Sequence, residues 1–281
     1  MPALKKMILV IGATATGKSD LAVRLALEND TEIISADSRQ IYKGIPIVTA
    51  VPDESQRMGV THHLMEVLPL DAYYSAAMFE EDALRIAREV WKRRDTVIVC
   101  GGSMMYVDAL LHGIDQLPTV PEEVRRTLAE DHARNGDDWL RERLRTLDPE
   151  YYAEVDLKNM KRVFHAVEIC ISAGTTYSSL RTGKKVEREF EIEKKVIDLP
   201  REQLFDRINR RVLKMVENGL EEEARRVYHL RHLNSLNTVG IKEMFDYFDG
   251  RTDFDTAVGK IQKNTRVYAK KQLTWLKKRL I

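Results

Sequence analysis

Apolar and polar residues alternate in blocks along the first part of the chain. Three short apolar runs rich in β-branched residues, over 6–12, 32–38 and 95–103, have the pattern of strands buried in a parallel sheet. The segments over 17–29 and 76–94 instead place apolar residues at helical spacing. Strands that alternate with helices in this way predict a doubly wound α/β sheet flanked by helices.

The pattern changes after residue 116. Over 117–193 the apolar residues keep helical spacing, and the sequence shows no convincing buried strand. Gly136 and Gly174 are placed to end helices. Three helices are expected there, over 121–136, 137–148 and 159–174.

The α/β pattern then returns, with a strand expected over 194–200 and a long amphipathic helix over 201–219. We therefore expect one α/β core built from 1–116 and 194–281. The stretch 117–193 would be an inserted helical subdomain.

Composition and charge exclude only a few classes of function. The 281 residues include 45 Lys and Arg against 44 Asp and Glu, so the whole-chain charge gives no hint of nucleic acid. Cys100 and Cys170 lack metal-ligand spacing, and the pair His62 and His63 is no metal signature. No apolar stretch approaches 18 residues. We expect a soluble, reduced, cytoplasmic protein without a membrane partner.

A glycine-rich segment with the pattern GxxxxGK[ST] lies between the first apolar run and the helix after it. It comprises Gly12, Ala13, Thr14, Ala15, Thr16, Gly17, Lys18 and Ser19. In a P-loop, backbone N–H groups and a helix N-terminus surround phosphate oxygens, the lysine adds charge and the serine holds Mg²⁺. The sequence thus predicts a P-loop NTPase-like parallel sheet, with an ordinary glycine turn as the alternative.

The third apolar run bears on the reaction. NTPase motors and switches normally end such a strand with an aspartate that supports Mg²⁺. Here the strand ends in Cys100, two glycines and Ser103. Transfer of a small group is therefore favoured over a motor or switch function.

A dense polar cluster, Asp37 to Gln40, follows the second apolar run. The carboxyl ends of parallel strands meet at one edge of the sheet, so Asp37 should face the same crevice as the P-loop. A carboxylate beside a bound diphosphate repels it, and this cost indicates a function for Asp37, of which accepting a proton from an incoming nucleophile is the natural one. A helix cap, a solvated loop acid and a ribose ligand are the alternatives.

The last predicted helix is strongly basic. From Thr256 onward it has no acidic residue and eight basic ones: Lys260, Lys263, Arg266, Lys270, Lys271, Lys277, Lys278 and Arg279. The helix could contact phosphates, or it could be a solvated basic end favoured by the helix dipole. Gln272 lies on its apolar side, where a structural amide and a contact with a base are both open.

Seven segments spread over nearly the whole chain resemble the tRNA dimethylallyltransferase (tRNA isopentenyltransferase) family. They are GATATGKS (12–19), DSRQIYKGIPIVTAVP (37–52), YSAAMF (74–79), VCGGSMMY (99–106), LPREQLFDRINRRV (199–212), NTVGIKEMFDY (237–247) and TRVYAKKQLTWLKK (265–278). They occur in the family's order, which makes the resemblance specific.

The resemblance implies transfer of a dimethylallyl group from its diphosphate to N6 of the adenosine just 3′ of the tRNA anticodon, with Mg²⁺. The P-loop would hold the diphosphate, and Asp37 would be the general base. Ser103 would contact the oxygen that joins the allyl group to the leaving diphosphate, and Arg207 would clamp that diphosphate. Because an allylic diphosphate leaves with carbocation character, Lys18, Arg207 and Mg²⁺ should help most by neutralising the departing charge.

The acceptor adenosine must leave its stack, and a flipped base needs polar contacts on its edge. Gln40 fits such a contact, with Ser38 and Arg39 beside it. By resemblance, further tRNA contacts come from Arg125, Lys161, Arg162, His165, Asn237, Gly240 and Lys242. A solvated surface is the alternative for each helix position. The expected partners are the anticodon stem-loop and dimethylallyl diphosphate, and the chain is expected to act as a monomer.

The chain departs from the family pattern at five positions. Ala13 stands where proline is usual, and Ser103 where threonine is usual, which keeps the hydroxyl. Val48 and Val51 replace a glycine and a lysine, and His165 replaces an arginine.

Three other functions are open at this point. A P-loop kinase would use Lys18 on ATP and Asp37 to activate a hydroxyl, but would not need the basic helix. A prenyltransferase could use free AMP as the acceptor, but a mononucleotide offers little for the helical insertion to bind. A non-catalytic RNA-binding protein would leave Asp37 idle.

Overall fold

The computed structural model describes residues 4–115, 117–183 and 186–279. The chain divides into two compact units. Unit 1 contains the described residues of Met1–Leu111 and Glu187–Ile281, and unit 2 is His112–Val186.

Unit 1 is built on a parallel sheet in the order β3-β2-β4-β1-β5. The strands are β1 Lys6–Gly12, β2 Ile33–Ala36, β3 His62–His63, β4 Thr96–Gly101 and β5 Glu191–Ile197. The central strands are buried on both faces, as Leu9, Ile34 and Ile98 show with no exposed surface. The predicted parallel α/β sheet is confirmed, and the runs chosen as strands were recognisable because both of their faces are apolar.

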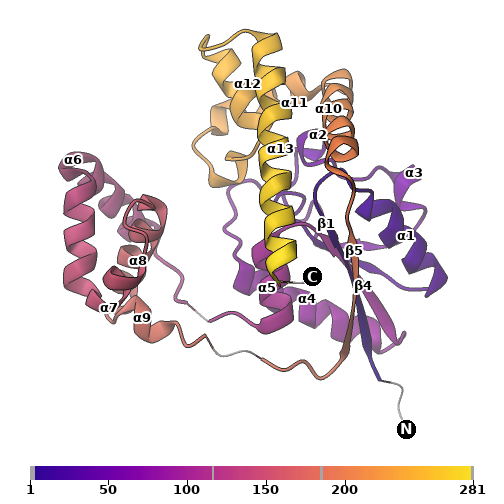
Figure 1. Cartoon of the computed structure of the whole chain (residues 1–281), viewed down its shortest axis with the longest axis horizontal. Coiled ribbons are helices and arrows are strands. Elements are labelled where there is room, and N and C mark those ends of the chain that lie inside the picture. The colour runs from indigo at the N-terminus through magenta and orange to yellow at the C-terminus, as the bar shows by residue number, and fades with distance from the viewer. Residues whose placement is uncertain (1–3, 116, 184–185, 280–281) are drawn as a thin grey trace. The chain divides into compact units, whose positions relative to one another are not determined.

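The helices of unit 1 flank this sheet, and several of them lie beyond the carboxyl ends of its strands (Figure 1). They are α1 Lys18–Glu28, α2 Pro46–Thr49, α3 Glu54–Arg57, α4 Ala76–Trp91, α5 Met104–His112, α10 Arg201–Glu217, α11 Leu220–Val227, α12 Ile241–Phe248 and α13 Phe254–Arg279, with 3₁₀ turns η1 Tyr228–Leu230 and η2 Asn234–Leu236. The helices expected at 17–29, 76–94 and 201–219 are confirmed.

Unit 2 is helical and has its own core. Its helices are α6 Glu122–Leu147, α7 Pro149–Glu154, α8 Met160–Ala173 and α9 Tyr177–Leu180. Gly136 has φ 82° and ψ −179°, which is not helical, so α6 is two helical segments separated at Gly136, as expected. Gly174 ends α8 in the left-handed region, as expected.

The predicted insertion, 117–193, differs from unit 2 at both ends. Its last residues fall in β5, which starts at Glu191 and pairs only with β1 in the described sheet. This edge strand reads EIEKKVI and leaves Glu191, Lys194 and Lys195 exposed. The sequence pattern predicts this strand over 194–200, later than its observed start at Glu191, because an edge strand needs no continuous apolar run.

The paired histidines have structural contacts. The Nδ1 of His62 lies 2.9 Å from the Val60 carbonyl oxygen, and the Nε2 of His63 lies 2.6 Å from Glu32 Oε2. Both cysteines are free. Among the residues that the structure describes, no helix has the length and apolar character needed to cross a membrane.

Candidate active site

The P-loop leaves β1 at Gly12 and enters α1 at Lys18. A side chain at Gly12 would place its Cβ 2.7 Å from the Ile197 carbonyl oxygen, so the close approach of β1 to β5 requires glycine. Gly17 has φ 91°, which also favours glycine. Inside the loop, Thr16 Oγ1 donates to the Ala13 carbonyl over 2.8 Å, and Lys18 Nζ donates to the same oxygen over 2.6 Å.

A cavity of about 580 Å³ opens above the P-loop. Its basic lining residues are Lys18, Arg207, Arg210, Arg211 and Lys214. Burial lowers the pKa of Lys18 to about 8, against a smaller raising effect of Cys100. A bound anion favours the charged ammonium and would raise this pKa again. The cavity, which we call the diphosphate cavity, is therefore suited to a polyanion.

Arg211 is a site residue that the sequence analysis missed. Its Nη1 donates to Thr14 Oγ1 over 3.1 Å, and burial lowers the pKa of its guanidinium while Asp37 opposes this shift. Arg207, which was predicted, has Nη1 3.8 Å from the position of a Cβ on Gly17. The two arginines are four residues apart and so share one face of α10, a spacing that could have revealed the second one.

A second cavity of about 290 Å³ adjoins the first, and Arg211 and Met215 line both. Its polar lining residues include Asp37 and Thr14, and its larger side chains include Val48 and Tyr268. We call it the acceptor cavity. The two cavities together form one two-chambered site at the carboxyl edge of the sheet.

Asp37 follows β2 directly and caps the turn after it. Its Oδ1 accepts hydrogen bonds from the backbone N–H groups of Arg39, over 2.8 Å, and Gln40, over 3.3 Å. Oδ2 is the oxygen that this turn does not use. The capping alternative and the proposed general base are therefore compatible, because they use different oxygens.

Ser103 joins the ends of β2 and β4. Its buried hydroxyl accepts from the Ser38 N–H over 2.8 Å and donates to Ser38 Oγ over 3.1 Å. The two strands come so close that a Cβ on Gly101 would lie 2.1 Å from the Ala36 carbonyl oxygen. Glycine at position 101 is thus a packing requirement. Ser103 is fixed to Ser38, the residue after Asp37, and lines neither of the two cavities described above.

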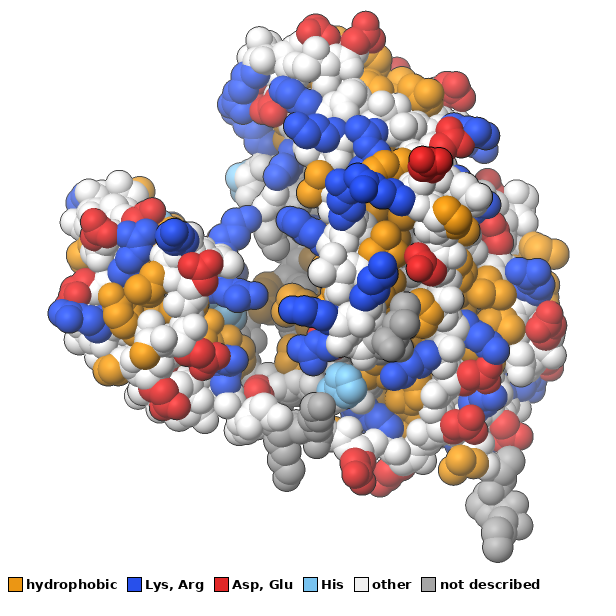
Figure 2. All heavy atoms as spheres, in the orientation of Figure 1, with side chains coloured by type: hydrophobic (Ala, Val, Ile, Leu, Met, Phe, Trp, Pro, Cys, Tyr) orange, Lys and Arg blue, Asp and Glu red, His pale blue; other side chains and the backbone are white. Residues whose placement is uncertain are grey.

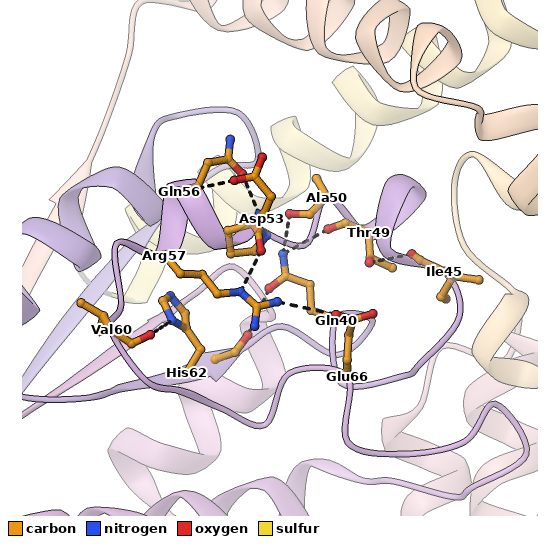
Figure 3. A network of polar contacts seen from close by, with 12 residues as sticks. Gln40, Ile45, Thr49, Ala50, Asp53, Gln56, Arg57, Val60, His62 and Glu66 are labelled. Carbon is orange, nitrogen blue, oxygen red and sulfur yellow. Dashed lines mark hydrogen bonds and ion pairs between the residues drawn. The ribbon is translucent and has the colours of Figure 1, made fainter.

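Gln40 holds the wall of the site rather than lining either cavity. Its Nε2 donates to the carbonyls of Thr49, over 3.1 Å, and Ala50, over 3.0 Å, while Oε1 accepts from Ser35 Oγ over 3.2 Å (Figure 3). Buried Glu223 on α11 accepts the N–H groups of Ile47 and Val48, each over 2.8 Å. The base contact predicted for Gln40 stays a prediction, and its amide already stabilises the 45–50 segment.

Arg39 fixes the opposite wall. Its Nη1 donates to the carbonyls of Asn234, over 2.9 Å, and Ser235, over 3.0 Å, and its Nη2 reaches the Asn237 carbonyl over 3.3 Å. Asn237 and Gly240 line the acceptor cavity, and Lys242 is exposed on α12.

Helix α13 contacts the site through Gln272, which is 3 % exposed. Its Oε1 accepts from the Thr14 N–H over 2.9 Å, and its Nε2 donates to the Gly102 carbonyl over 2.8 Å. Of the two open roles for Gln272, these bonds favour the structural amide. Lys270 and Lys271 remain exposed, and Figure 2 shows Lys and Arg side chains gathered over this part of unit 1.

The predicted tRNA contacts in unit 2 gather around one buried carboxylate. Arg125 Nε donates to Glu168 Oε2 over 2.9 Å, and His165 Nδ1 lies 2.8 Å from Glu168 Oε1. Burial alone would raise the pKa of Glu168, but these two partners bring it below its usual range. Lys161 and Arg162 are exposed on α8. The tRNA-binding role of the unit stays a prediction.

The diphosphate cavity offers oxygen ligands for a cation. In the described ranges, no group of three or more His, Cys, Asp or Glu side chains is placed to hold a metal ion. However, Ser19, Asp20 and Asp53 line the cavity. Mg²⁺ usually takes few protein oxygens and completes its shell with substrate phosphates and water, so this lining fits it.

The fold and the two-chambered site define a P-loop α/β protein of the group-transfer class. A family model described as IPP transferase matches residues 40–279, and the chain belongs to that family. The chain is 50% identical to tRNA dimethylallyltransferase 1 of Phocaeicola vulgatus, over 97% of this chain and 91% of that one, and 49% identical to the Bacteroides fragilis protein of the same name, over 98% and 91%.

Solved structures agree with this assignment. The tRNA isopentenylpyrophosphate transferase of Bacillus halodurans superposes with a TM-score of 0.69 at 32% identity, covering 98% of this chain and 88% of that one. A eukaryotic dimethylallyltransferase acting on tRNA gives 0.82 at 25% identity, covering 97% and 70%.

Proposed function

We propose that this enzyme transfers a dimethylallyl group from dimethylallyl diphosphate to N6 of the adenosine 3′-adjacent to the anticodon in tRNA, and releases diphosphate. The observation that carries the proposal is the pair of adjoining cavities. One is lined by five basic side chains and the P-loop, and the other by the Asp37 carboxylate, with Arg211 in the wall between them.

The donor diphosphate would lie in the diphosphate cavity. Lys18, Arg207 and Arg211 surround it with positive charge, and Ser103 at the strand end would contact the bridging oxygen. Charge builds on the leaving diphosphate as the C–O bond breaks, so these fixed cations stabilise the transition state more than the ground state. Ser19 would hold Mg²⁺, which adds further neutralisation of the diphosphate when it is bound.

The acceptor base would enter the acceptor cavity. As the new N–C bond forms at the allylic carbon, the adenine amine loses a proton and Asp37 accepts it. General-base help of this kind is worth about 10² to 10⁴ in rate. Asp37 suits the role because only Oδ1 is used by the local turn.

The tRNA anticodon stem-loop would be held by basic side chains on both units. Lys270 and Lys271 on α13 and Lys161 and Arg162 on α8 are exposed and free to approach phosphates. The chain would act as a monomer in the cytoplasm, where tRNA is found.

A three-way transfer assay tests the proposal. Radiolabelled dimethylallyl diphosphate is supplied with unmodified tRNA or with AMP, and labelled ATP is supplied in parallel. Label is expected in tRNA and not in AMP. Absence of prenyl transfer by well-folded protein would contradict the proposal, and label in AMP would assign a free-nucleotide acceptor instead.

A further inference from the structure

One buried side chain connects the two loops that build the donor site. The Gln272 amide accepts from the Thr14 N–H of the P-loop and donates to the Gly102 carbonyl of the loop before Ser103. The contact is tight, because a Cβ on Gly102 would lie 2.4 Å from Gln272 Nε2. Among the residues that the structure describes, no other side chain of α13 has hydrogen bonds to both loops.

The bridge decides which P-loop groups face an anion. P-loop N–H groups normally converge on phosphate oxygens, but the Thr14 N–H is occupied by Gln272. Thr14 is also held through its hydroxyl by Arg211. The tip of the loop is thus fixed from α13 on one side and from α10 on the other, and the residues after Thr14 provide the anion-binding N–H groups.

We infer that Gln272 is a positioning residue: it sets the P-loop against the Gly102–Ser103 loop and thereby fixes the diphosphate between them. The inference rests on the proposed function for the identity of the donor, but inorganic diphosphate is sufficient to test it. A buried amide with both ends bonded is costly to replace, since loss of either bond leaves a buried backbone group unpaired.

The geometry predicts an unusual response to Gln272→Glu. An ionised carboxylate can accept from the Thr14 N–H but repels the Gly102 carbonyl. A protonated carboxyl again has one acceptor and one O–H donor, which reproduces the pattern of the amide. Burial also favours the protonated form. The defect of this variant should therefore shrink as the pH falls.

The test is calorimetric binding of inorganic diphosphate with Mg²⁺, with each variant compared with the wild type at the same pH from 8.5 to 6. Gln272→Met should bind diphosphate about tenfold more weakly at every pH, because it loses one buried hydrogen bond to each of the two loops. Gln272→Glu should bind at least as weakly at pH 8.5 and approach the wild type near pH 6. Thr274→Ala, an exposed change on the same helix, should match the wild type throughout.

Binding by Gln272→Glu that equals the wild type at pH 8.5 would overturn the inference, and so would a deficit that does not change with pH. If Gln272→Met does not fold, the pH dependence of Gln272→Glu still decides. A wild type that binds diphosphate but transfers no prenyl group would contradict the proposed function and leave this inference standing.

Discussion

At the residue scale, the site depends on side chains that take part both in local structure and in the proposed chemistry. Asp37 caps its turn with Oδ1, and Ser103 fixes Ser38 while it stands at the end of β4. Such double use keeps the reacting groups rigid, and rigid groups need little reorganisation in the transition state. Substitutions here should therefore separate chemistry from binding only when the capping bonds survive.

Asp37→Asn is such a substitution. The amide oxygen can still accept the two N–H groups of the turn, but the side chain cannot accept a proton. Transfer to tRNA should fall by about 10² to 10⁴, while inorganic diphosphate should bind as in the wild type. Single-turnover transfer and calorimetry measure the two quantities. Unchanged turnover would remove the general-base role.

Lys18 gives a pH prediction. Its pKa of about 8 is below the usual value for lysine, so near pH 8 a fraction of the ammonium groups is deprotonated. A bound diphosphate raises this pKa, and binding should therefore take up protons near pH 8 and not at pH 6.5, where Lys18 is already charged. Calorimetry in buffers of different ionisation enthalpy measures the uptake. Lys18→Met is the control for protons exchanged by diphosphate itself. Equal proton uptake by the wild type and by Lys18→Met would contradict the assignment of the uptake to Lys18.

At the element scale, some pieces could be predicted from the sequence and others could not. The central strands were evident because both faces are apolar, whereas β5 was placed too late because it lies at the edge. The short helix α2 begins with a proline, a local helix-start signal, but its backbone is held by Glu223, far along the chain. The P-loop and Asp37 were found from motif and strand order. Gln272 takes its role from partners distant in sequence, which periodicity alone cannot supply, whereas the spacing of Arg211 from Arg207 on α10 was a local signal for Arg211.

The contact between α2 and the start of α12 gives an element-scale prediction. Gly240 has φ 102°, and a Cβ there would lie 2.3 Å from Val48 Cγ2. Gly240→Ala should lower the free energy of unfolding by roughly 2 to 4 kcal/mol, from backbone strain together with this overlap. Adding Val48→Ala should recover part of that loss, because only the overlap is relieved. Denaturant unfolding of the two single variants and the double variant gives the coupling, and strict additivity would contradict the account.

At the whole-molecule scale, the chain is two units with separate cores. In unit 2, fully buried Asp148 accepts from the Tyr151 N–H, the Ser178 N–H and the Ser178 hydroxyl, over 2.7 to 3.0 Å. This carboxylate ties α7 to α9 within unit 2. Because unit 2 has its own hydrophobic core, we expect it to lose stability independently of unit 1.

Asp148→Ala tests this independence. It leaves three donors of unit 2 unpaired, one of them buried and two half-buried, and should destabilise that unit by about 2 to 5 kcal/mol. Hydrogen exchange should quicken within 112–186 and stay unchanged in β1 and β4, and inorganic diphosphate should bind as before. Weaker diphosphate binding, with faster exchange in the sheet, would show that the two units unfold together.

The Gln272 bridge also has a consequence for synthesis of the protein. Gln272 and Thr14, which are joined by one of the two bonds of this bridge, are 258 positions apart in the chain. At ribosomal speeds of roughly 5 to 20 residues per second, α13 emerges some tens of seconds after the P-loop. During that interval the nascent chain already carries its phosphate motif without the side chain that shapes it. An incomplete chain should therefore compete poorly for the donor, so that diphosphate capture begins only once the last helix has docked.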